Sequence, residues 1–527
     1  MPEEISVKKY SRVLLALCVL FIVVQVPLVW NGGSLGVFNS PDATANYHFA
    51  RGLFEGRGLA EPARDIGDVS EFLFMRSSRI TGGFELPVGF FGLVLLYGFI
   101  SKLLFMDLIP YLTVVAAAGG VYAFFQILRE FFPGRIAFIS ALLLMVHPAW
   151  WYYTNDSLFP NVLFISSALF CLWLLVSGSK RSSRNQLFCS GLLCGIALLV
   201  RGIELVWFLP LVATCMIVLQ SRIRPRTAAL FAFGAVFPVA AAIIYVGSTT
   251  PLLFPFGYAV GSASDAGLAE TFSPFAFHPR LIAQTGWNYL VKIFWPYALL
   301  SGIGIFSILL GKPLQKKWIW WTGATAALSA VLLVLYGSWR IIDHPNSAAV
   351  TIGTSYVRYF LPIYIFSIPF AALVLDNLPE FARKSAARML RPFLGMSLLV
   401  FLWHTAITGS DESILAKQAT LKGYSELAAW VVGNIPHDAV IVTDKSDKYV
   451  WPHRTVITSY QSDAALAALE KLVREDRYPV FFMGREFFPD IPGVDAERLS
   501  SFGLSLAQPL HRQYGIAVYP LQLLNDN

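Results

Sequence analysis

The sequence has few charged residues and few cysteines. Only 14% of its 527 residues are charged, whereas a soluble globular chain carries about 25%. This shortage extends over most of the length, and with a mean hydropathy of +0.59 it places the chain in a lipid bilayer. The five cysteines all lie inside apolar runs, so they indicate neither a disulfide framework nor a zinc site. No nucleotide-binding loop is present in the sequence.

The formal net charge is +7, and the basic residues lie in short clusters between the apolar runs. Clusters of this kind are what membrane orientation requires. Nucleic acid is therefore a poor candidate for a partner.

Eleven apolar runs are candidates for membrane helices, each of which needs about 20 mostly apolar residues. The first run is too long for a signal peptide and no cleavage site follows it, so we expect a membrane anchor. The eleven runs are residues 13–30, 108–128, 136–153, 158–176, 187–200, 203–219, 228–246, 289–310, 318–336, 359–375 and 392–407.

A twelfth run, residues 86–105, decides the orientation. If it spans the membrane and the N-terminus is inside, the basic clusters of the later short loops lie outside, against the positive-inside rule. If it lies flat at the outer interface, all those clusters face the cytoplasm, and its glycines and Pro87 suit such a helix. Twelve spans with an outside N-terminus misplace only the first cluster and stay open as an alternative. We expect eleven spans in the plasma (inner) membrane, with a cytoplasmic N-terminus.

Three regions are polar enough to lie in water on the extracytoplasmic side: outer loop 31–107, which contains the interfacial helix 86–105, outer loop 247–288, and the tail 410–527. In the tail, AVIVT and PVFFMG flank a helical pattern at 463–477, which predicts a small α/β domain. The predicted fold is therefore an α-helical polytopic membrane module over residues 1–409, followed by an extracytoplasmic α/β domain.

Two acids lie on the predicted outer face of the membrane. Asp42 follows Pro41 in the first outer loop, and Asp156 lies in WWYYTNDSLFP at the end of the third span. On one face of the membrane, such carboxylates serve acid/base or acceptor-orienting roles. The alternative is that Asp42 caps a helix and Asp156 solvates a helix end.

Two arginines lie beside the hydrocarbon at the outer surface. Arg201 separates two apolar runs in ALLVRGIELVW, and Arg358 lies in SYVRYFLPIY. Charges at this depth are costly and are functional or snorkelling. A lipid phosphate suits both, because it arrives at this depth and pairs with guanidinium. Four residues are weaker candidates for substrate contacts: Tyr47, His48, His278 and Tyr359.

The order of these features resembles the GT-C superfamily of polyprenyl-phosphate-sugar-dependent glycosyltransferases, nearest to its aminoarabinose-transferase-like and protein-O-mannosyltransferase-like members. The matching segments are SPDATANYHFARGLFEGRGL, ELPVGFFGLVLLYG, HPAWWYYTNDSLFPN, GLLCGIALLVR and YVRYFLPIYIFSIP. The resemblance covers most of the chain, and it depends on the order of the segments more than on any single motif.

The resemblance implies a sugar transfer from a polyprenyl-phosphate donor to a lipid, polysaccharide or protein acceptor, with inversion at the sugar. It makes Asp42 the catalytic base, Asp156 the second acid and Arg358 the ligand of the donor phosphate. It also implies a mobile loop over the donor cavity at 247–288. Many relatives carry a second acid beside the first, whereas Ala43 follows Asp42 here. No cofactor is expected, and a divalent metal, although possible, is not supported.

Two rival functions remain at this stage. A transporter or flippase for a lipid-linked glycan would carry charged or broken segments at mid-membrane and an inverted repeat, and the sequence shows neither. A non-catalytic envelope assembly protein would use the tail to bind a partner. The glycosyltransferase is the preferred interpretation.

Overall fold

The structure, a computed structural model, describes residues 2–104, 107–218, 225–252, 254–255, 277–310, 316–341, 343–344, 346, 348–381, 384–458, 462–485 and 496–524. Most of the predicted outer loop 247–288 therefore lies outside the described residues, and so does its proposed mobility. The basic residues Arg222, Arg224, Lys312 and Arg383 lie outside them as well.

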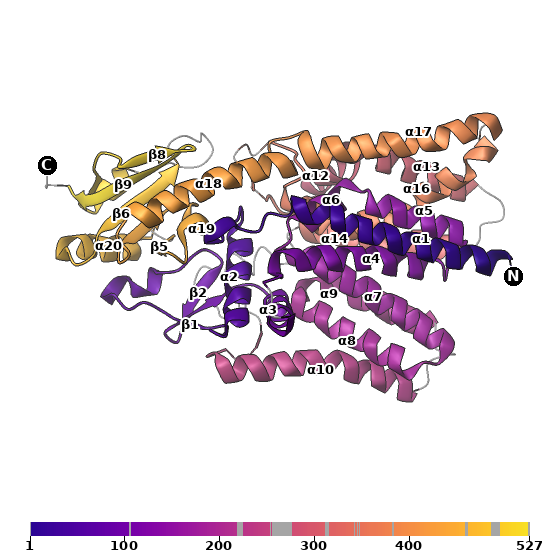
Figure 1. The fold of residues 1–527 in the computed structure, drawn as a ribbon, viewed down its shortest axis with the longest axis horizontal. Coiled ribbons are helices and arrows are strands. Elements are labelled where there is room, and N and C mark those ends of the chain that lie inside the picture. The colour runs from indigo at the N-terminus through magenta and orange to yellow at the C-terminus, as the bar shows by residue number, and fades with distance from the viewer. Residues whose placement is uncertain are drawn as a thin grey trace.

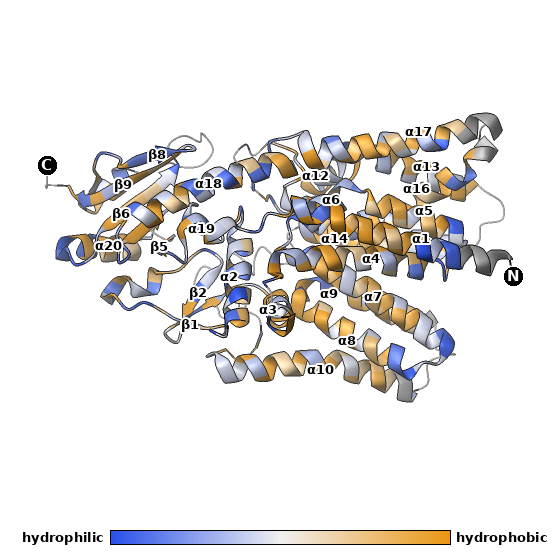
Figure 2. Ribbon diagram, viewed as in Figure 1, coloured by the Kyte–Doolittle hydropathy of each residue, from blue (hydrophilic) through white to orange (hydrophobic). Residues whose placement is uncertain are grey.

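A bundle of apolar helices forms one half of the molecule, and a polar lobe forms the other (Figures 1 and 2). The bundle helices are α1 (Pro2–Gln25), α4 (Leu112–Leu128), α5 (Gly134–Met145), α6 (Pro148–Asn155), α7 (Pro160–Arg181), α8 (Arg184–Val200), α9 (Leu205–Val218), α10 (Pro225–Thr249), α12 (Pro279–Gly286), α13 (Trp295–Leu310), α14 (Lys316–Gly337), α15 (Ser355–Tyr359), α16 (Leu361–Phe381) and α17 (Lys384–Leu402), with π-helical turns at Trp287–Lys292 (η8) and Trp403–Thr408 (η9).

By length and composition, 7 helices of the described chain can cross a membrane, or up to 10 if each bent helix pair counts as one span. The bent pairs are α5 with α6 (51°), α8 with α9 (118°), and α12–η8 with α13 (97°). The prediction of eleven spans counts α8 and α9 separately. The predicted class, a polytopic helical membrane protein, is confirmed.

Close packing of α8 against α10 depends on glycines. A Cβ added at Gly191 would lie 2.1 Å from the carbonyl oxygen of Phe231, and one at Gly195 would lie 2.2 Å from that of Ala235. A side chain at either position would push the two backbones apart, as in other small-residue helix contacts in membranes. The G-x-x-x-G spacing at 191–195 therefore marks this interface.

The first outer region, between α1 and α4, begins with a well-capped helix. In α2 (Pro41–Glu55), Ser40 is the N-cap and accepts a hydrogen bond from the Asp42 amide, Pro41 takes the first position, and Gly56 closes the helix at φ 85°. These are the preferred residues at both helix ends. A small sheet of order β1-β3-β2 follows, made of β1 (Glu61–Pro62), β2 (Ser78–Thr81) and β3 (Phe84–Pro87).

The ambiguous run 86–105 forms a short helix, α3 (Gly92–Leu104), of 13 residues. This length is below the roughly 20 residues that a span needs. Figure 1 shows α3 nearly end-on, across the direction of the bundle helices. The expectation that this run does not span the membrane agrees with its length and direction.

The tail forms the predicted α/β domain. Helix α18 (Ile414–Asn434) leads from the bundle into a six-stranded sheet of order β5-β4-β6-β9-β7, with β8 pairing β9. Strands β4, β5 and β6 are parallel, and β9 is antiparallel to β6. The elements are β4 (Val440–Thr443), α19 (Asp447–Val450), β5 (Thr455–Ile457), α20 (Asp463–Glu475), β6 (Val480–Arg485), α21 (Ala496–Ser501), β7 (Leu504–Leu506), β8 (His511–Gln513) and β9 (Ile516–Leu523).

The first outer region packs into the core of this domain. Val69 and Leu73, which lie in and just after a 3-10 helix at Gly67–Phe72 (η3), are buried in one cluster with Val440 and Leu469. Segments almost 400 residues apart in sequence therefore share one hydrophobic core. Burial of apolar surface stabilises their contact, so the lobe behaves as a joint unit built from both segments.

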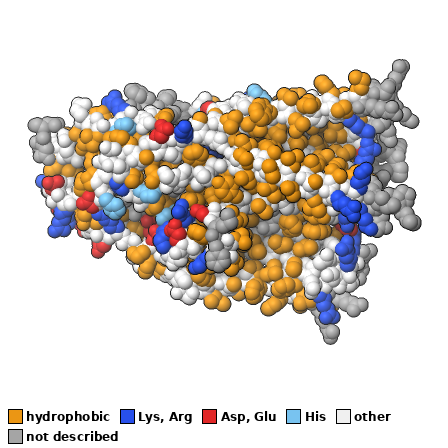
Figure 3. Space-filling model, in the orientation of Figure 1, with side chains coloured by type: hydrophobic (Ala, Val, Ile, Leu, Met, Phe, Trp, Pro, Cys, Tyr) orange, Lys and Arg blue, Asp and Glu red, His pale blue; other side chains and the backbone are white. Residues whose placement is uncertain are grey.

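Surface charges differ between the two ends of the molecule. In Figure 3 an apolar belt covers the bundle, and Lys and Arg side chains form a rim at the end where the N-terminus lies. At the opposite end, acidic, basic and histidine side chains are mixed over the lobe. The apolar belt has the character of a surface that contacts lipid.

Candidate functional site

Asp42 lies at the junction of the bundle and the lobe. Its side chain is exposed, and its Oδ1 accepts a hydrogen bond of 2.6 Å from the hydroxyl of Ser77. Ser40, not Asp42, caps α2, so the alternative reading of Asp42 as the helix cap is wrong. The carboxylate in the first turn still gains from the partial positive charge of the helix N-terminus.

Arg358 lies at the end of the short helix α15, directly before α16. Its guanidinium lies over the ring of Phe159, 4.0 Å from the centroid, and donates a weak 3.4 Å hydrogen bond to the Tyr359 hydroxyl. Within the described residues, its Nε–H has no hydrogen-bond partner and no carboxylate forms an ion pair with it. A half-buried guanidinium with free donors is suited to bind an anion.

Arg201 also lies close to the ring of Tyr359. The guanidinium carbons of Arg201 and Arg358 lie 4.9 Å and 5.2 Å from the ring centroid of Tyr359. Tyr359 also stacks on Tyr336, with ring centroids 4.3 Å apart. The structure thus brings together three of the predicted site residues, Arg201, Arg358 and Tyr359.

A buried acid neutralises Arg201. Arg201 Nε donates to Glu204 Oε1 at 2.7 Å, and Glu204 is only 3% exposed. The same carboxylate oxygen accepts from the Tyr336 hydroxyl at 2.8 Å, and its other oxygen accepts from the indole of Trp207. Of the two predicted phosphate ligands, Arg358 is therefore the one that forms no ion pair within the described part of the chain.

Electrostatics link Asp42 to this group of residues. Burial by itself lowers the pKa of Arg358, but the neighbouring Tyr359, Tyr153, Asp42 and Asp343 raise it above the ordinary value. The Asp42 carboxylate and the Arg358 guanidinium therefore interact electrostatically.

Asp156 is held by the tail. As the C-cap residue of α6, it forms an ion pair with Lys417 of α18, with 2.5 Å between Oδ2 and Nζ. Both residues line a pocket between α6, α18 and the chain around Phe38. The structure therefore places Asp156 at the same end of the bundle as Asp42 but gives it a basic partner.

Three of the weaker candidates lie elsewhere. The Tyr47 hydroxyl accepts a hydrogen bond of 3.0 Å from Arg51. His48 pairs with Glu61 at 2.9 Å, and its ring lies edge-on to Trp451 at 4.5 Å. His278 is exposed at the N-terminus of α12. Tyr47 and His48 thus make intramolecular contacts, and Tyr359 alone of the four lies beside Arg358.

The partner of His48, Glu61, lies opposite a second acid that is partly buried. Glu85 on β3 is directly opposite Glu61 on β1. Burial raises the pKa of Glu85 to about 7, hydrogen bonds from Ser78 and Trp451 oppose this rise, and the charge of Glu61 adds to it. Like charges directly across a strand pair destabilise each other, so the folded lobe favours protonated Glu85.

The pH dependence of stability follows from this carboxyl group. Below pH 4.5, its ordinary pKa, the Glu85 carboxyl is protonated in both the folded and the unfolded protein. As the pH rises to about 7, the carboxyl ionises first in the unfolded chain, so the free energy of unfolding falls. Relative to Glu85→Gln, the parent should lose roughly 3 kcal/mol across this window. Thermal unfolding in detergent at pH 5 and pH 8 measures the loss, with exposed Glu71→Gln as control. Equal pH responses of parent and Glu85→Gln would contradict the expectation.

Three residues of the site were not predicted from the sequence: Ser77, Glu204 and Lys417. Glu204 had a local signal, because it lies three residues after Arg201 in an apolar run, and residues at this spacing meet on a helix. Ser77 and Lys417 have no such signal. Over the described part of the chain, no group of three or more His, Cys, Asp or Glu side chains is arranged to hold a metal ion.

Comparison with known proteins informs the fold of this chain. Residues 96–245 match the family model described as Dolichyl-phosphate-mannose-protein mannosyltransferase. Among curated protein sequences, none matches this chain. The fold is similar to that of ArnT from Cupriavidus metallidurans bound to undecaprenyl phosphate, with a TM-score of 0.55 and 11% identity over 95% of this chain and 97% of that one.

The apo form of the Archaeoglobus fulgidus oligosaccharyltransferase is also similar, with a TM-score of 0.50 and 12% identity over 90% of this chain and 69% of that one. At such identities the likeness shows the fold. The resemblance that the order of sequence motifs indicated is thus confirmed: this chain has the GT-C-like fold, a polytopic helical bundle with a small sheet domain at its C-terminus.

Proposed function

We propose that this protein is a membrane glycosyltransferase that moves a sugar from a polyprenyl-phosphate donor to an acceptor on the extracytoplasmic face. The observation that carries the proposal is the electrostatic interaction between the exposed Asp42 carboxylate and the Arg358 guanidinium, whose Nε–H has no hydrogen-bond partner among the described residues. The GT-C-like fold and the match to the mannosyltransferase family model support it.

In the proposed reaction, Asp42 acts on the acceptor and Arg358 acts on the leaving phosphate. Asp42 takes the proton from an acceptor hydroxyl or amine while that acceptor atom attacks the anomeric carbon. The bond between this carbon and the phosphate oxygen breaks, and the lipid phosphate leaves with its added negative charge. Arg358 stabilises that charge through its free N–H groups. One displacement of this kind inverts the anomeric configuration and leaves no sugar on the enzyme.

Arg201 and Asp156 take supporting roles in this proposal. Because Glu204 already neutralises Arg201, its contribution is to hold the ring of Tyr359, with any contact to phosphate limited to its remaining N–H groups. Because Lys417 neutralises Asp156, this acid orients the acceptor or completes the pocket. Asp156→Asn should impair turnover less than loss of Asp42.

Replacement of Arg358 tests the donor site. Arg358→Ala should weaken binding of undecaprenyl phosphate by roughly 10–100-fold, because hydrogen bonds to a charged group contribute about 1.5–3 kcal/mol. Arg358→Lys should recover only part, since an ammonium cannot fork onto two phosphate oxygens. Native mass spectrometry of the purified protein measures the affinity. Arg135→Ala, at a residue paired with Asp376, is the control, and parental affinity in both Arg358 variants would show that this residue only snorkels.

The proposed orientation places the basic rim in the cytoplasm and the lobe outside. The rim of Lys and Arg at the N-terminal end (Figure 3) supports it, because positive charge is retained on the cytoplasmic side. A reporter that is active only outside should therefore be active when fused after Ile407 and inactive after Lys180. Activity at Lys180 would reverse the orientation and remove Asp42 from the extracytoplasmic face.

A further inference from the structure

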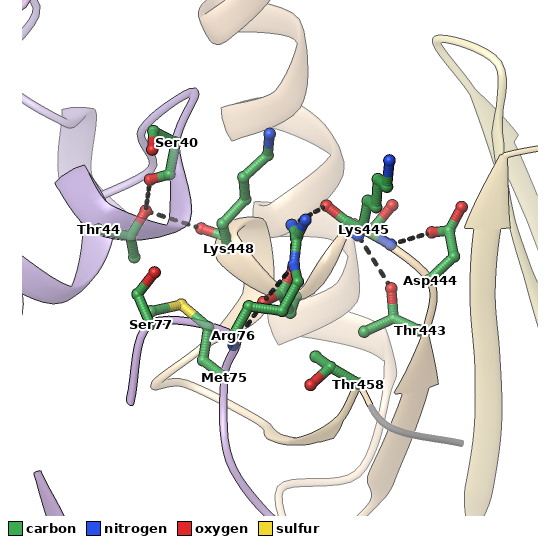
Figure 4. Close-up of polar contacts among 12 residues, drawn as sticks. Ser40, Thr44, Met75, Arg76, Ser77, Thr443, Asp444, Lys445, Lys448 and Thr458 are labelled. Carbon is green, nitrogen blue, oxygen red and sulfur yellow. Dashed lines mark hydrogen bonds and ion pairs between the residues drawn. The ribbon is translucent and has the colours of Figure 1, made fainter. Parts of the chain in front are cut away.

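The turn that precedes β2 connects the Asp42 carboxylate to the C-terminal domain. Ser77 in this turn donates the 2.6 Å hydrogen bond to Asp42 Oδ1. Its neighbour Arg76 reaches in the other direction, toward the segment between β4 and α19 (Figure 4). Two consecutive residues thus join the proposed base to a domain that begins almost 370 residues later in the sequence.

Arg76 is fixed by a bidentate ion pair. Its Nε and Nη2 lie 3.0 Å and 2.6 Å from Asp447 Oδ1, and its backbone N–H donates to Asp447 Oδ2 at 3.0 Å. Nη2 also donates to the Lys445 carbonyl at 2.8 Å. Asp447 is fully buried. Because the pair holds both the backbone and the side chain of Arg76, it fixes the position of the adjacent Ser77.

The helix that carries Asp42 is bound to the same place. The Thr44 hydroxyl donates to the Lys448 carbonyl at 3.3 Å, and the Lys448 ammonium donates to the Asn39 carbonyl. Figure 4 shows α2, the turn and the segment 443–448 meeting around these contacts. The short helix α19 therefore holds both the helix of Asp42 and the turn of its hydrogen-bond donor.

We propose that the C-terminal domain positions the base, with Asp447 acting through Arg76 and Ser77 to hold the Asp42 carboxylate toward the acceptor. The inference rests on the proposed function of Asp42. Asp447, Arg76 and Ser77 are positioning residues, since they act through Asp42. A displacement of about 1 Å at a reacting group can lower a rate by about 10²-fold, so the loss of this support should be visible in turnover.

The test compares variants along this connection. Ser77→Ala should lower kcat by roughly tenfold and Asp447→Asn by roughly 10–100-fold, each with the donor KM unchanged, and Ser77→Thr should restore kcat because it keeps the hydroxyl. Asp68→Asn is the matched control: its ion pair with Lys471, 2.6 Å long, joins the same two segments at an exposed position. Its kcat should equal that of the parent. Rates are measured in membranes of a deletion strain with a radiolabelled polyprenyl-phosphate hexose.

The outcomes separate this inference from the proposed function. Parental turnover in Asp42→Asn refutes the proposed function itself. If Asp42→Asn is inactive but Ser77→Ala and Asp447→Asn keep the parental kcat, only the positioning role is overturned. A rise in the donor KM of Ser77→Ala and Asp447→Asn with kcat unchanged overturns it as well. If Asp447→Asn fails to fold, the two Ser77 variants still test the inference. A fall in kcat in Ser77→Ala that is absent in Ser77→Thr supports it, and parental kcat in Ser77→Ala overturns it.

Discussion

Asp42→Asn is expected to lower turnover by roughly 10²–10⁴-fold, the usual contribution of a general base, without loss of undecaprenyl phosphate binding. Asparagine keeps the shape of the side chain and an oxygen that can accept the hydrogen bond from Ser77. It cannot take up the acceptor proton, because an amide is not a base at neutral pH. Arg358, which meets the phosphate in the proposal, is unchanged. The defect should therefore lie in kcat and leave donor affinity at the parental value.

Transfer of label from a polyprenyl-phosphate hexose gives the rate, and native mass spectrometry gives the affinity for undecaprenyl phosphate. Asp68→Asn, in the same outer region but paired with Lys471, is the control and should behave as the parent does. An Asp42→Asn enzyme with parental turnover would remove Asp42 from the reaction. A product that retains the donor's anomeric configuration would contradict the single displacement.

The helical bundle could be predicted because hydropathy is a local property. Each apolar run of about 20 residues must satisfy its backbone groups as a helix in lipid, so residues such as 108–128 and 158–176 define spans without knowledge of their neighbours. The strands Val440–Thr443 and Val480–Arg485 could be predicted too, since both are apolar and β-branched or aromatic. The sheet of the first outer region was missed, because Glu61–Pro62 and Ser78–Thr81 are short and polar.

The candidate site could be predicted only in part. Arg201 and Arg358 stand out because a charge beside the hydrocarbon is costly, and this cost can be read from one segment at a time. Asp42 stands out by its position after Pro41 in the first outer loop. Their partners cannot be found in that way. Ser77 lies 35 residues from Asp42 in the chain, and Lys417 lies far from Asp156. Such pairs form only when segments that are distant in the sequence have folded together.

The difference matters for assigning roles to the two arginines. From the sequence, Arg201 and Arg358 are equivalent cations at the outer surface. In the structure Arg201 has a buried carboxylate at 2.7 Å, whereas the Nε–H of Arg358 has no partner among the described residues. A charge that is already neutralised attracts an anion less. In the proposed reaction we therefore assign the phosphate to Arg358, and Arg201 to the group of residues that holds Tyr359.

Among the residues that hold Tyr359, Glu204 should be the one whose loss destabilises the protein most. Glu204→Ala leaves the half-buried Arg201 guanidinium without its counter-ion and removes the acceptor of Tyr336 and Trp207. Breaking a buried ion pair by removal of one partner costs about 3–5 kcal/mol. Glu204→Gln should recover only part of this loss, because its amide can present one accepting oxygen where three donors converge.

The thermal unfolding midpoint of the purified protein in detergent measures this effect, with Glu475→Gln at an exposed helix end as control. Replacing both partners, as Glu204→Leu with Arg201→Met, should be less destabilising than Glu204→Ala alone, because no unpaired charge remains in the bundle. The double variant keeps Arg358 and should still bind undecaprenyl phosphate, although more weakly, because Tyr359 loses its support. If Glu204→Ala unfolds at the parental temperature, the ion pair does not hold this part of the bundle. If the double variant loses all affinity while it remains folded, Arg201 contacts the phosphate directly.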